Sequence, residues 1–515
     1  MKILMSALLC LMTITSYGKS ETNEKPFLTA QQQEDFYNLL ISEIERLDAE
    51  IIETRNNSKN VSWREFVDYQ KDKFLNAKDW DELYQTFDEF HDGLVNLHSS
   101  AIFLAYEPEP KKSQWLNSAI WFEYPIPKFY LAKTKQPIVA LNKKPIGKLF
   151  KAFSDYRCRH NNEAGCVADF ARRIEAGAIT VDGAKIKEIT LSNGNEETVE
   201  YEAIYDAPPK SRTDYMSENY CDAHSGYEGF TSIFKGQNAC LYSKEKTAVL
   251  RLRHFIYPDH QDPSIYCDTK DATSSYCSDI NGVLAELKKH NIEHLVFDMT
   301  HNIGGMENSP LLAAFMPDKF KDLTVAYKNT KEIHNPTIRQ ELFYGNPKGE
   351  NWYQKSKNVE GEYFAPRADF CQGADDCSLE WIEPRKDAFK AEKISIISDW
   401  KCVSSCDDFV WRMQDYAGAE VYGIAPAQDA TYARIKLYLY LGANGQVQKK
   451  VVGEMTEFKV SDKELLLAEV KMPYSKTVTE EGKLRNTEPV NINVVPYTIS
   501  NRKHYASDVL RTILE

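Results

Sequence analysis

Apolar residues recur at helical spacing through the first part of the chain. Thr29 and Gln32 form the pattern of a capping box, which predicts where the first helix begins. Two further amphipathic stretches follow before the chain reaches the segment 96–99. This pattern predicts a helical bundle. Its apolar positions are Phe36, Leu40, Ile44, Leu47 and Ile51, then the stretch 63–75, then Trp80, Leu83, Tyr84, Phe87 and Leu94.

The pattern changes to short β-type stretches between residues 120 and 206, which predict a small mixed domain. Two of these stretches flank Asn193-Gly194, a dipeptide that favours the tight turn of a hairpin. Residues 207–245 are polar and rich in turn formers, so they are predicted to be a linker. The predicted strands of the small domain cover residues 137–141, 186–191 and 198–201.

From residue 246 onward, buried-looking strands alternate with amphipathic helices, which indicates an α/β domain. Residues 330–385 interrupt it and are predicted to be a polar, loop-like insertion. Several β-type segments follow, up to about residue 496. The predicted strands are 248–252, 295–299, 394–397 and 420–423, and the predicted helices are 280–287, one from about 309, and 407–417.

The first eighteen residues predict an export signal. Lys2 precedes an apolar run at residues 3–14, and the small residues at 16–18 suit cleavage. A lipid anchor at Cys10 is the less favoured alternative, because that cysteine lacks a small residue before it. No later stretch approaches ~18 consecutive apolar residues, so no membrane span is predicted. We therefore expect an exported protein, periplasmic or secreted.

The 515 residues are enough for about three domains. Lys plus Arg total 63 and Asp plus Glu total 76, which gives a net charge of −13. Such an acidic chain argues against nucleic acid as a partner. The predicted division is a signal peptide at 1–18, a helical domain at 19–118, a small domain at 119–206, a linker at 207–245 and an α/β domain at 246–515.

Ten of the 11 cysteines follow the signal peptide and form neighbouring couples. Short loops lose the least entropy on closure, so local pairing is expected in an exported protein. No CxxC pair occurs, and the HxxEH pattern at 290–294 lies at a helix-to-strand junction, so no metal site is predicted. The predicted disulfides are Cys158–Cys166, Cys221–Cys240, Cys267–Cys277, Cys371–Cys377 and Cys402–Cys406.

Two turns and one histidine could carry chemistry. Ser404 and Ser405 lie between a strand and a helix N-terminus, which suits a nucleophilic serine, although helix capping by either serine explains the same residues. Gly304 and Gly305 follow a buried strand, where backbone N–H groups can form an oxyanion hole; a plain helix-entry turn is the alternative. His98, at the end of the bundle, is the candidate base.

These three segments together resemble the tail-specific (C-terminal processing) serine peptidases. The closer similarity is to the branch with the tricorn protease core and interphotoreceptor retinoid-binding protein, and it covers most of the mature chain. Residues 96–99 resemble that branch's Asp-Gly-His-Thr motif, 295–305 its Asp-Leu-Arg-Gly-Asn-x-Gly-Gly motif, and 403–407 its Ala-Ser-Ala-Ser-Glu motif. Thr300-His301 departs from the Arg-Gly pair of the second motif.

The resemblance implies an α/β, crotonase-like catalytic domain at 246–515, after the helical domain and a degenerate PDZ-like domain at 119–206. It implies an exported serine endopeptidase that acts on peptide or protein substrates and needs no cofactor. Ser404 would be the nucleophile. The tail-specific branch has a lysine base about 25 residues later, but Asp429 stands there, so the histidine of the tricorn-like branch is expected instead.

In that scheme His98 takes the proton from Ser404. A later acid orients the histidine in this branch, and Glu488 is the predicted candidate. The N–H groups of Gly304 or Gly305, together with that of Ser405, would hold the oxyanion. Two other functions fit the same scaffold: an inactive protein that binds a ligand or peptide, and an adaptor that binds peptides through the PDZ-like domain.

Overall fold

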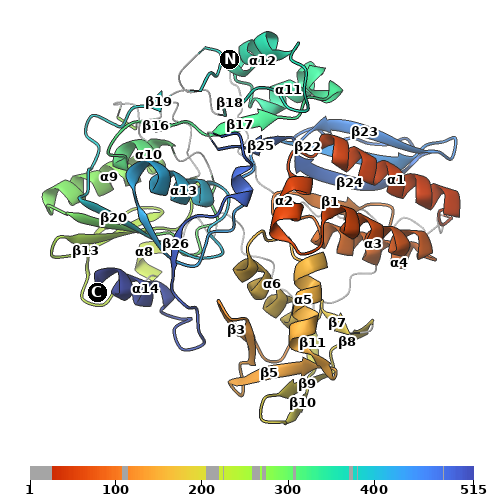
Figure 1. The fold of residues 1–515 in the computed structure, drawn as a ribbon, viewed down its shortest axis with the longest axis horizontal. Coiled ribbons are helices and arrows are strands. Elements are labelled where there is room, and N and C mark those ends of the chain that lie inside the picture. The colour runs from red at the N-terminus through yellow and green to blue at the C-terminus, as the bar shows by residue number, and fades with distance from the viewer. Residues whose placement is uncertain are drawn as a thin grey trace.

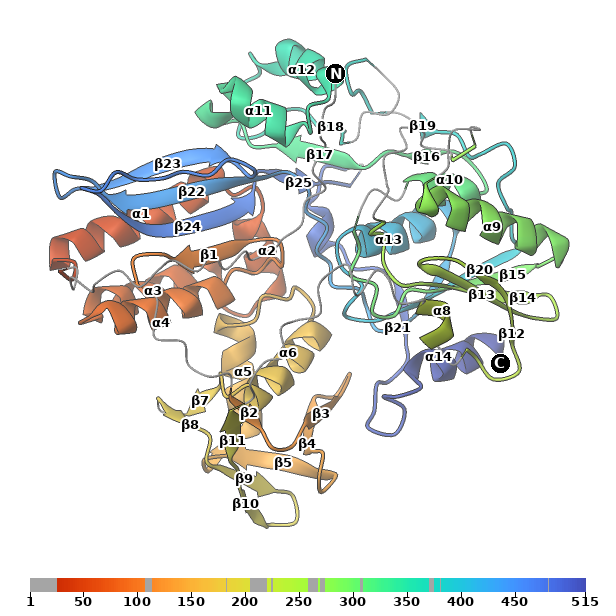
Figure 2. The same cartoon turned by 180° about the vertical axis from the view of Figure 1, so that it is seen from behind.

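The computed structural model contains three lobes, each with its own hydrophobic core, as Figure 1 and Figure 2 show from opposite sides. The predicted signal peptide and Cys10 lie outside the described residues. The structure describes residues 26–515 except 107–113, 182, 204–219, 224–225, 258–266, 269–273, 306–308, 370–374, 380 and 480.

The first lobe joins the N-terminal helices to strands from far along the chain. The helices lie against an antiparallel sheet with the order β1-β24-β22-β23 (Figure 1). Residues 434–473 therefore pack with the helical domain rather than within the predicted unit 246–515. The sequence does not indicate this, because such long-range strand pairing leaves no local pattern. The elements are α1 (Ala30–Leu47), α2 (Ile51–Ser58), α3 (Trp63–Asn76), α4 (Trp80–Asp92), β1 (Ser100–Phe103), β22 (Arg434–Leu441), β23 (Val447–Gly453) and β24 (Leu465–Pro473).

The predicted capping box at the start of α1 is confirmed. Thr29 Oγ1 accepts the N–H of Gln32 at 3.3 Å, and Gln32 Oε1 accepts the N–H of Thr29 at 2.9 Å. The expectation that Ile51 continues this helix is wrong. Asp48 Oδ1 accepts the N–H of Ile51 at 2.8 Å, so the chain turns there and Ile51 begins α2.

The small lobe, residues 114–203, has a sheet with the order β10-β9-β5-β4-β3 and two helices on it. The predicted hairpin is present between β9 and β10. Figure 2 shows this lobe below the other two. The elements are β2 (Gln114–Leu116), β3 (Ile120–Glu123), β4 (Lys128–Leu131), β5 (Gln136–Leu141), β6 (Lys144–Pro145), α5 (Ile146–Tyr156), α6 (Glu163–Glu175), β7 (Thr180–Val181), β8 (Ala184–Lys185), β9 (Glu188–Leu191), β10 (Glu196–Thr198) and β11 (Tyr201–Ala203).

The large lobe is built on a seven-stranded sheet with the order β12-β13-β14-β15-β20-β21-β26. The strands from β14 to β26 run parallel, as the alternating pattern predicts. Helices α9, α10 and α13 cover one face, and α8 and α14 cover the other. The elements are α8 (Tyr220–Ala223), β12 (Thr231–Lys235), β13 (Ala239–Lys244), β14 (Thr247–Leu252), α9 (Ser275–Lys289), β15 (His294–Asp298), α10 (Ser309–Phe315), β20 (Lys393–Ser398), α13 (Ser405–Ala417), β21 (Glu420–Gly423), β26 (Ile492–Val494) and α14 (Tyr505–Leu514).

Two predicted irregular segments contain regular structure. The predicted linker 207–245 contributes β12 and β13 to the large sheet, because Leu241 and its neighbours in β13 are buried. The predicted loop-like insertion holds two helices whose buried side chains are part of the first lobe's hydrophobic core. The remaining elements are β16 (Phe320–Lys321), β17 (Thr324–Tyr327), η1 (Lys331–His334), α11 (Pro336–Leu342), α12 (Pro347–Ser356), β18 (Arg367–Ala368), β19 (Trp381–Ile382), β25 (Ser475–Thr477) and η2 (Arg485–Thr487).

Neighbouring cysteines are bonded to each other as local pairing predicts. Cys377 is also disulfide-bonded, but its predicted partner Cys371 lies outside the described residues. Within the part of the chain that the structure describes, no helix is long and apolar enough to cross a membrane, and no group of His, Cys, Asp and Glu could hold a metal ion. The disulfides are Cys158–Cys166, Cys221–Cys240, Cys267–Cys277 and Cys402–Cys406.

Candidate active site

Ser404 lies in the turn between the end of β20 and the start of α13. Its backbone has φ 61° and ψ −131°, a region that costs a non-glycine residue on the order of 1–3 kcal/mol. A strained strand-to-helix turn also exposes the nucleophile of α/β-hydrolases. The disulfide between Cys402 and Cys406 closes this turn on both sides of the serine.

The two serines of this turn have different surroundings. The Ser404 side chain makes no capping hydrogen bond to α13, although Ser404 occupies the N-cap position. The Ser405 hydroxyl donates to the carbonyl of Gly305 at 3.1 Å and is buried. Helix capping therefore does not explain the Ser404 hydroxyl, which is half-buried at the helix N-terminus.

His98 lies in the turn between α4 and β1 and pairs with a buried aspartate. Its Nδ1 is 2.7 Å from Asp429 Oδ1, while the other carboxylate oxygen accepts the N–H of Leu97. A carboxylate only accepts hydrogen bonds, so Nδ1 carries a proton and Nε2 of the neutral ring has a free lone pair. The pair thus presents a ring nitrogen that can accept a proton.

The electrostatics of Asp429 favour its charged form. Burial acts to raise the pKa of this carboxyl, the charge and hydrogen bond of His98 oppose it, and the net result is a pKa below the usual value. The N–H of Leu97 and the nearby Arg159 guanidinium act in the same direction. The carboxylate is therefore ionised at neutral pH, where it can stabilise a positive charge on His98.

Asp429 also connects the candidate base, His98, to residues 402–406, the turn that carries Ser404, which we call the nucleophile turn. Its backbone carbonyl accepts the N–H of Ser404 at 2.8 Å, while its carboxylate holds His98. The two residues predicted as nucleophile and base, which are 306 positions apart in the sequence, thus contact one residue. This shared contact is the main geometric feature of the site.

The acid that contacts His98 is not the predicted residue, Glu488. Glu488 is 3.7 Å from Lys483, and its side chain is 40% exposed. The carboxylate that contacts His98 belongs to Asp429. In the sequence, Asp429 drew attention only because it stands where the tail-specific branch has its lysine. The prediction of Glu488 is corrected on this point, because an exposed carboxylate paired with lysine does not contact the histidine ring.

The turn that carries Gly304 and Gly305, which we call the glycine turn, lies directly against the nucleophile turn. A Cβ atom built on Gly304, whose φ is +75°, would lie 2.9 Å from Ser404 Cβ and 2.9 Å from the Ser405 nitrogen. Only glycine permits this approach. The Gly304 N–H, however, already donates to Asn302 Oδ1 at 2.8 Å. Of the two predicted glycine donors, Gly305 is therefore the better candidate.

A buried ion pair supports the glycine turn. Asp298 ends β15 and accepts hydrogen bonds from Tyr227, Arg251 and Thr300. Burial acts to raise the pKa of Asp298, but the Arg251 charge and the hydrogen bonds from Tyr227 and Thr300 together lower it. These contacts hold the chain where it leaves the strand toward Gly304.

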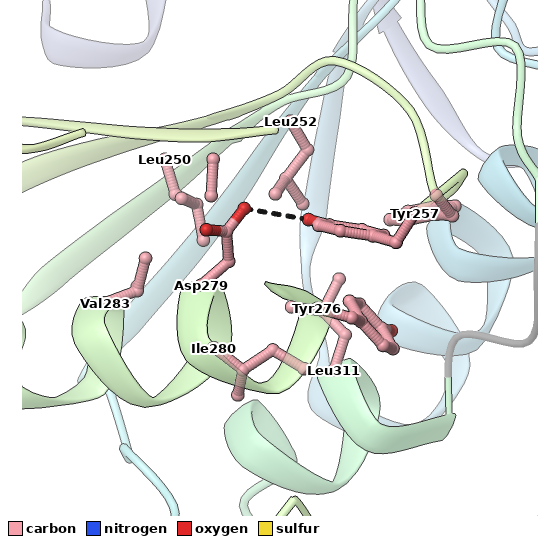
Figure 3. Close-up of a pocket in the computed structure, with 10 residues that line it drawn as sticks. Leu250, Leu252, Tyr257, Tyr276, Asp279, Ile280, Val283 and Leu311 are labelled. Atoms are coloured by element: carbon pink, nitrogen blue, oxygen red, sulfur yellow. Dashed lines mark hydrogen bonds between the residues drawn. The ribbon is translucent and has the colours of Figure 1, made fainter. Parts of the chain in front are cut away.

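Two cavities lie near these turns. The one in Figure 3 has a volume of about 10 Å³, room for about one water molecule, and a hydrogen bond of 3.0 Å joins Tyr257 to Asp279 in its wall. It is too small for a substrate. A second cavity of about 210 Å³ opens where β15 and β20 end, and His301 and Trp400 are among its lining residues.

Comparisons with known proteins support the fold. No protein-family model and no curated protein matches the chain. A solved mutant of CPAF is 14% identical with a TM-score of 0.60, covering 94% of this chain and 96% of that chain. CPAF in complex with lactacystin is 13% identical with a TM-score of 0.59, covering 94% and 97%.

A photosystem II D1 C-terminal processing protease also matches, at 10% identity and a TM-score of 0.34, covering 91% of this chain and 93% of that chain. The chain has the fold of CPAF, a mixed arrangement of helices and sheets.

Proposed function

We propose that this protein is a serine peptidase in which Ser404, His98 and Asp429 act together. The observation that carries the proposal is the position of Asp429, which binds the backbone of the serine and the ring of the histidine. The hydroxyl of Ser404, which makes no capping hydrogen bond to α13, and the strained turn around it support the same function. The fold of CPAF is compatible with it.

In the proposed reaction, Ser404 Oγ attacks the scissile carbonyl carbon while His98 Nε2 takes the hydroxyl proton. Asp429 stabilises the resulting imidazolium. The N–H groups of Gly305 and Ser405 stabilise the oxyanion. The C–N bond then breaks as His98 returns the proton to the leaving amine. Water hydrolyses the acyl-enzyme through the same histidine, which restores the free serine.

We further propose that the substrates are peptides or proteins met outside the cytosol. The local disulfides support this, because such bonds persist in oxidising compartments. The predicted signal peptide agrees with it. The proposed catalytic part is crotonase-like and the small lobe PDZ-like, with no cofactor in the reaction.

A fluorophosphonate probe tests the proposal, because it reacts only with an activated serine. We expect the wild-type protein to be labelled at Ser404, and Ser404→Ala to remain unlabelled. Ser405→Ala is the matched control and should retain labelling, since the proposed reaction uses the backbone N–H of Ser405 and not its hydroxyl, which donates to the Gly305 carbonyl. Lactacystin, with which CPAF was solved, should compete with the probe.

The rival function is an inactive protein that binds ligands on the same scaffold. A folded wild-type protein that neither reacts with the probe nor hydrolyses peptides would support that function and refute the peptidase. Labelling lost in Ser405→Ala but kept in Ser404→Ala would place the nucleophile one residue later.

A further inference from the structure

The small lobe reaches the candidate active site through one short loop. We call residues 158–162, which connect α5 to α6, the clamp loop. The disulfide between Cys158 and Cys166 ties the start of this loop to the first part of α6. The loop lies away from the sheet of its own lobe and contacts the segments that carry His98 and Asp429.

Arg159 holds the turn that carries His98. Its Nη2 donates to the carbonyls of Asn96 at 3.1 Å and Leu97 at 3.2 Å, and also to the carbonyl of Ser99. These carbonyls flank His98 on both sides. The turn belongs to no helix or strand, so side chains rather than a backbone ladder fix its conformation.

The last two residues of the clamp loop, Asn161 and Asn162, hold the segment before Asp429. Asn161 Nδ2 donates to the carbonyl of Gln428. Asn162 Nδ2 donates to the carbonyl of Pro426 at 2.6 Å, while its Oδ1 accepts the N–H of Gly165 at the start of α6. Each asparagine therefore connects the small lobe to the backbone that leads to Asp429.

We propose that Arg159 and Asn161 are positioning residues for the His98–Asp429 pair. This inference rests on the proposed peptidase function. Nη2 of the Arg159 guanidinium contacts three carbonyls of this turn while Nη1 lies 3.1 Å from His91 Nε2, and a lysine ammonium, with one nitrogen, cannot make both sets of contacts. Arg159 sets where the imidazole of His98 lies relative to Ser404, and Asn161 sets where the carboxylate of Asp429 lies. Both side chains bind the backbone beside His98 and Asp429, so their removal is expected to slow the chemical step more than it weakens the binding of substrate.

The test compares rates of fluorophosphonate labelling at saturating probe for folded variants. Arg159→Ala should react about tenfold to a hundredfold more slowly, because small misplacements of a catalytic group have effects of that size. The concentration of probe that gives half the maximal rate should stay within about twofold of wild type, and added guanidinium should restore part of the rate. Arg159→Lys should restore less than guanidinium does.

Arg172→Ala is the matched control. Arg172 lies in the same lobe, its side chain is 63% exposed, and it pairs with Asp169. Its removal should leave the labelling rate unchanged. Asn161→Ala is a smaller change that serves if Arg159→Ala does not fold, and it should slow labelling at saturating probe in the same way.

The outcomes separate the two hypotheses. A reactive wild type together with equally reactive, folded Arg159→Ala and Asn161→Ala variants would overturn the positioning role and leave the peptidase standing. Loss of rate that guanidinium does not restore, with the same loss in Arg172→Ala, would also overturn it, since the effect would then be structural. A wild type that never reacts would overturn both.

Discussion

Replacing Asp429 with asparagine should remove the function of the base while changing very few atoms. The carboxylate accepts two hydrogen bonds, one from His98 Nδ1 and one from the N–H of Leu97. An amide offers one acceptor and one NH₂ group. If its oxygen faces His98, the NH₂ opposes the N–H of Leu97, and two donors meet in a buried site.

If the amide turns the other way, its NH₂ faces His98. The ring then accepts at Nδ1 and carries its proton on Nε2, so it cannot take the proton of Ser404. A triad aspartate replaced by asparagine costs about 10⁴ in turnover for this reason, which is about 5 kcal/mol of transition-state stabilisation. We expect a loss of that order for Asp429→Asn.

The assay is peptide hydrolysis or probe labelling, measured beside the free energy of unfolding. Asp279→Asn is the matched control, because Asp279 is another buried aspartate that accepts backbone N–H groups, yet it lies in the wall of the small core cavity. It should lose stability and keep its activity per folded molecule. Since His98 and Asp429 act as a unit, the double variant His98→Ala/Asp429→Asn should lose no more than His98→Ala alone. Strictly additive losses, or an active Asp429→Asn, would refute the reasoning.

Three further predictions follow from the same contacts. Gly304→Ala should abolish labelling, because its Cβ would lie 2.4 Å from a carbonyl of the nucleophile turn, whereas Gly194→Ala has the same sign of φ but open space and should stay active. Burial raises the pKa of Asp322 to about 7, so the free energy of unfolding should fall as the pH rises from about 4 to about 7, by at most about 1.4 kcal/mol per pH unit, and Asp322→Asn should flatten that slope in urea titrations. Replacing Cys402 and Cys406 by serine should lower the labelling rate clearly and the melting temperature only slightly. A variant that is labelled as fast as wild type would contradict a stiffening role for that disulfide.

Local patterns in the sequence predicted the local parts of the structure. The capping box of α1, the strand β21 and the turn before α13 depend on neighbouring residues, and all three are present. The pairing of β1 with β24 joins residues more than 360 positions apart, so no periodicity could reveal it. The predicted linker failed for the same reason, because β12 and β13 become strands only against the rest of the sheet.

The candidate site likewise contains residues that a local motif predicts and one whose role depends on a long-range contact. Ser404, His98 and Gly304 stand in recognisable motifs, and the structure brings their segments together. Asp429 has no motif around it, and its role depends on a buried contact with a distant histidine. Its position about 25 residues after the serine was a usable signal, because a carboxylate where the tail-specific peptidases have a lysine predicts a different base.

The way the first lobe is assembled determines when this protein can become active. His98 is made early in synthesis, whereas Ser404, Asp429 and the strands β22 and β24 that complete its sheet come in the last quarter of the chain. An incomplete chain therefore holds the proposed base without the proposed nucleophile. The local disulfides can close as each segment emerges, but under the proposed function hydrolysis must wait for nearly the whole polypeptide, which would protect the synthesising cell from premature proteolysis.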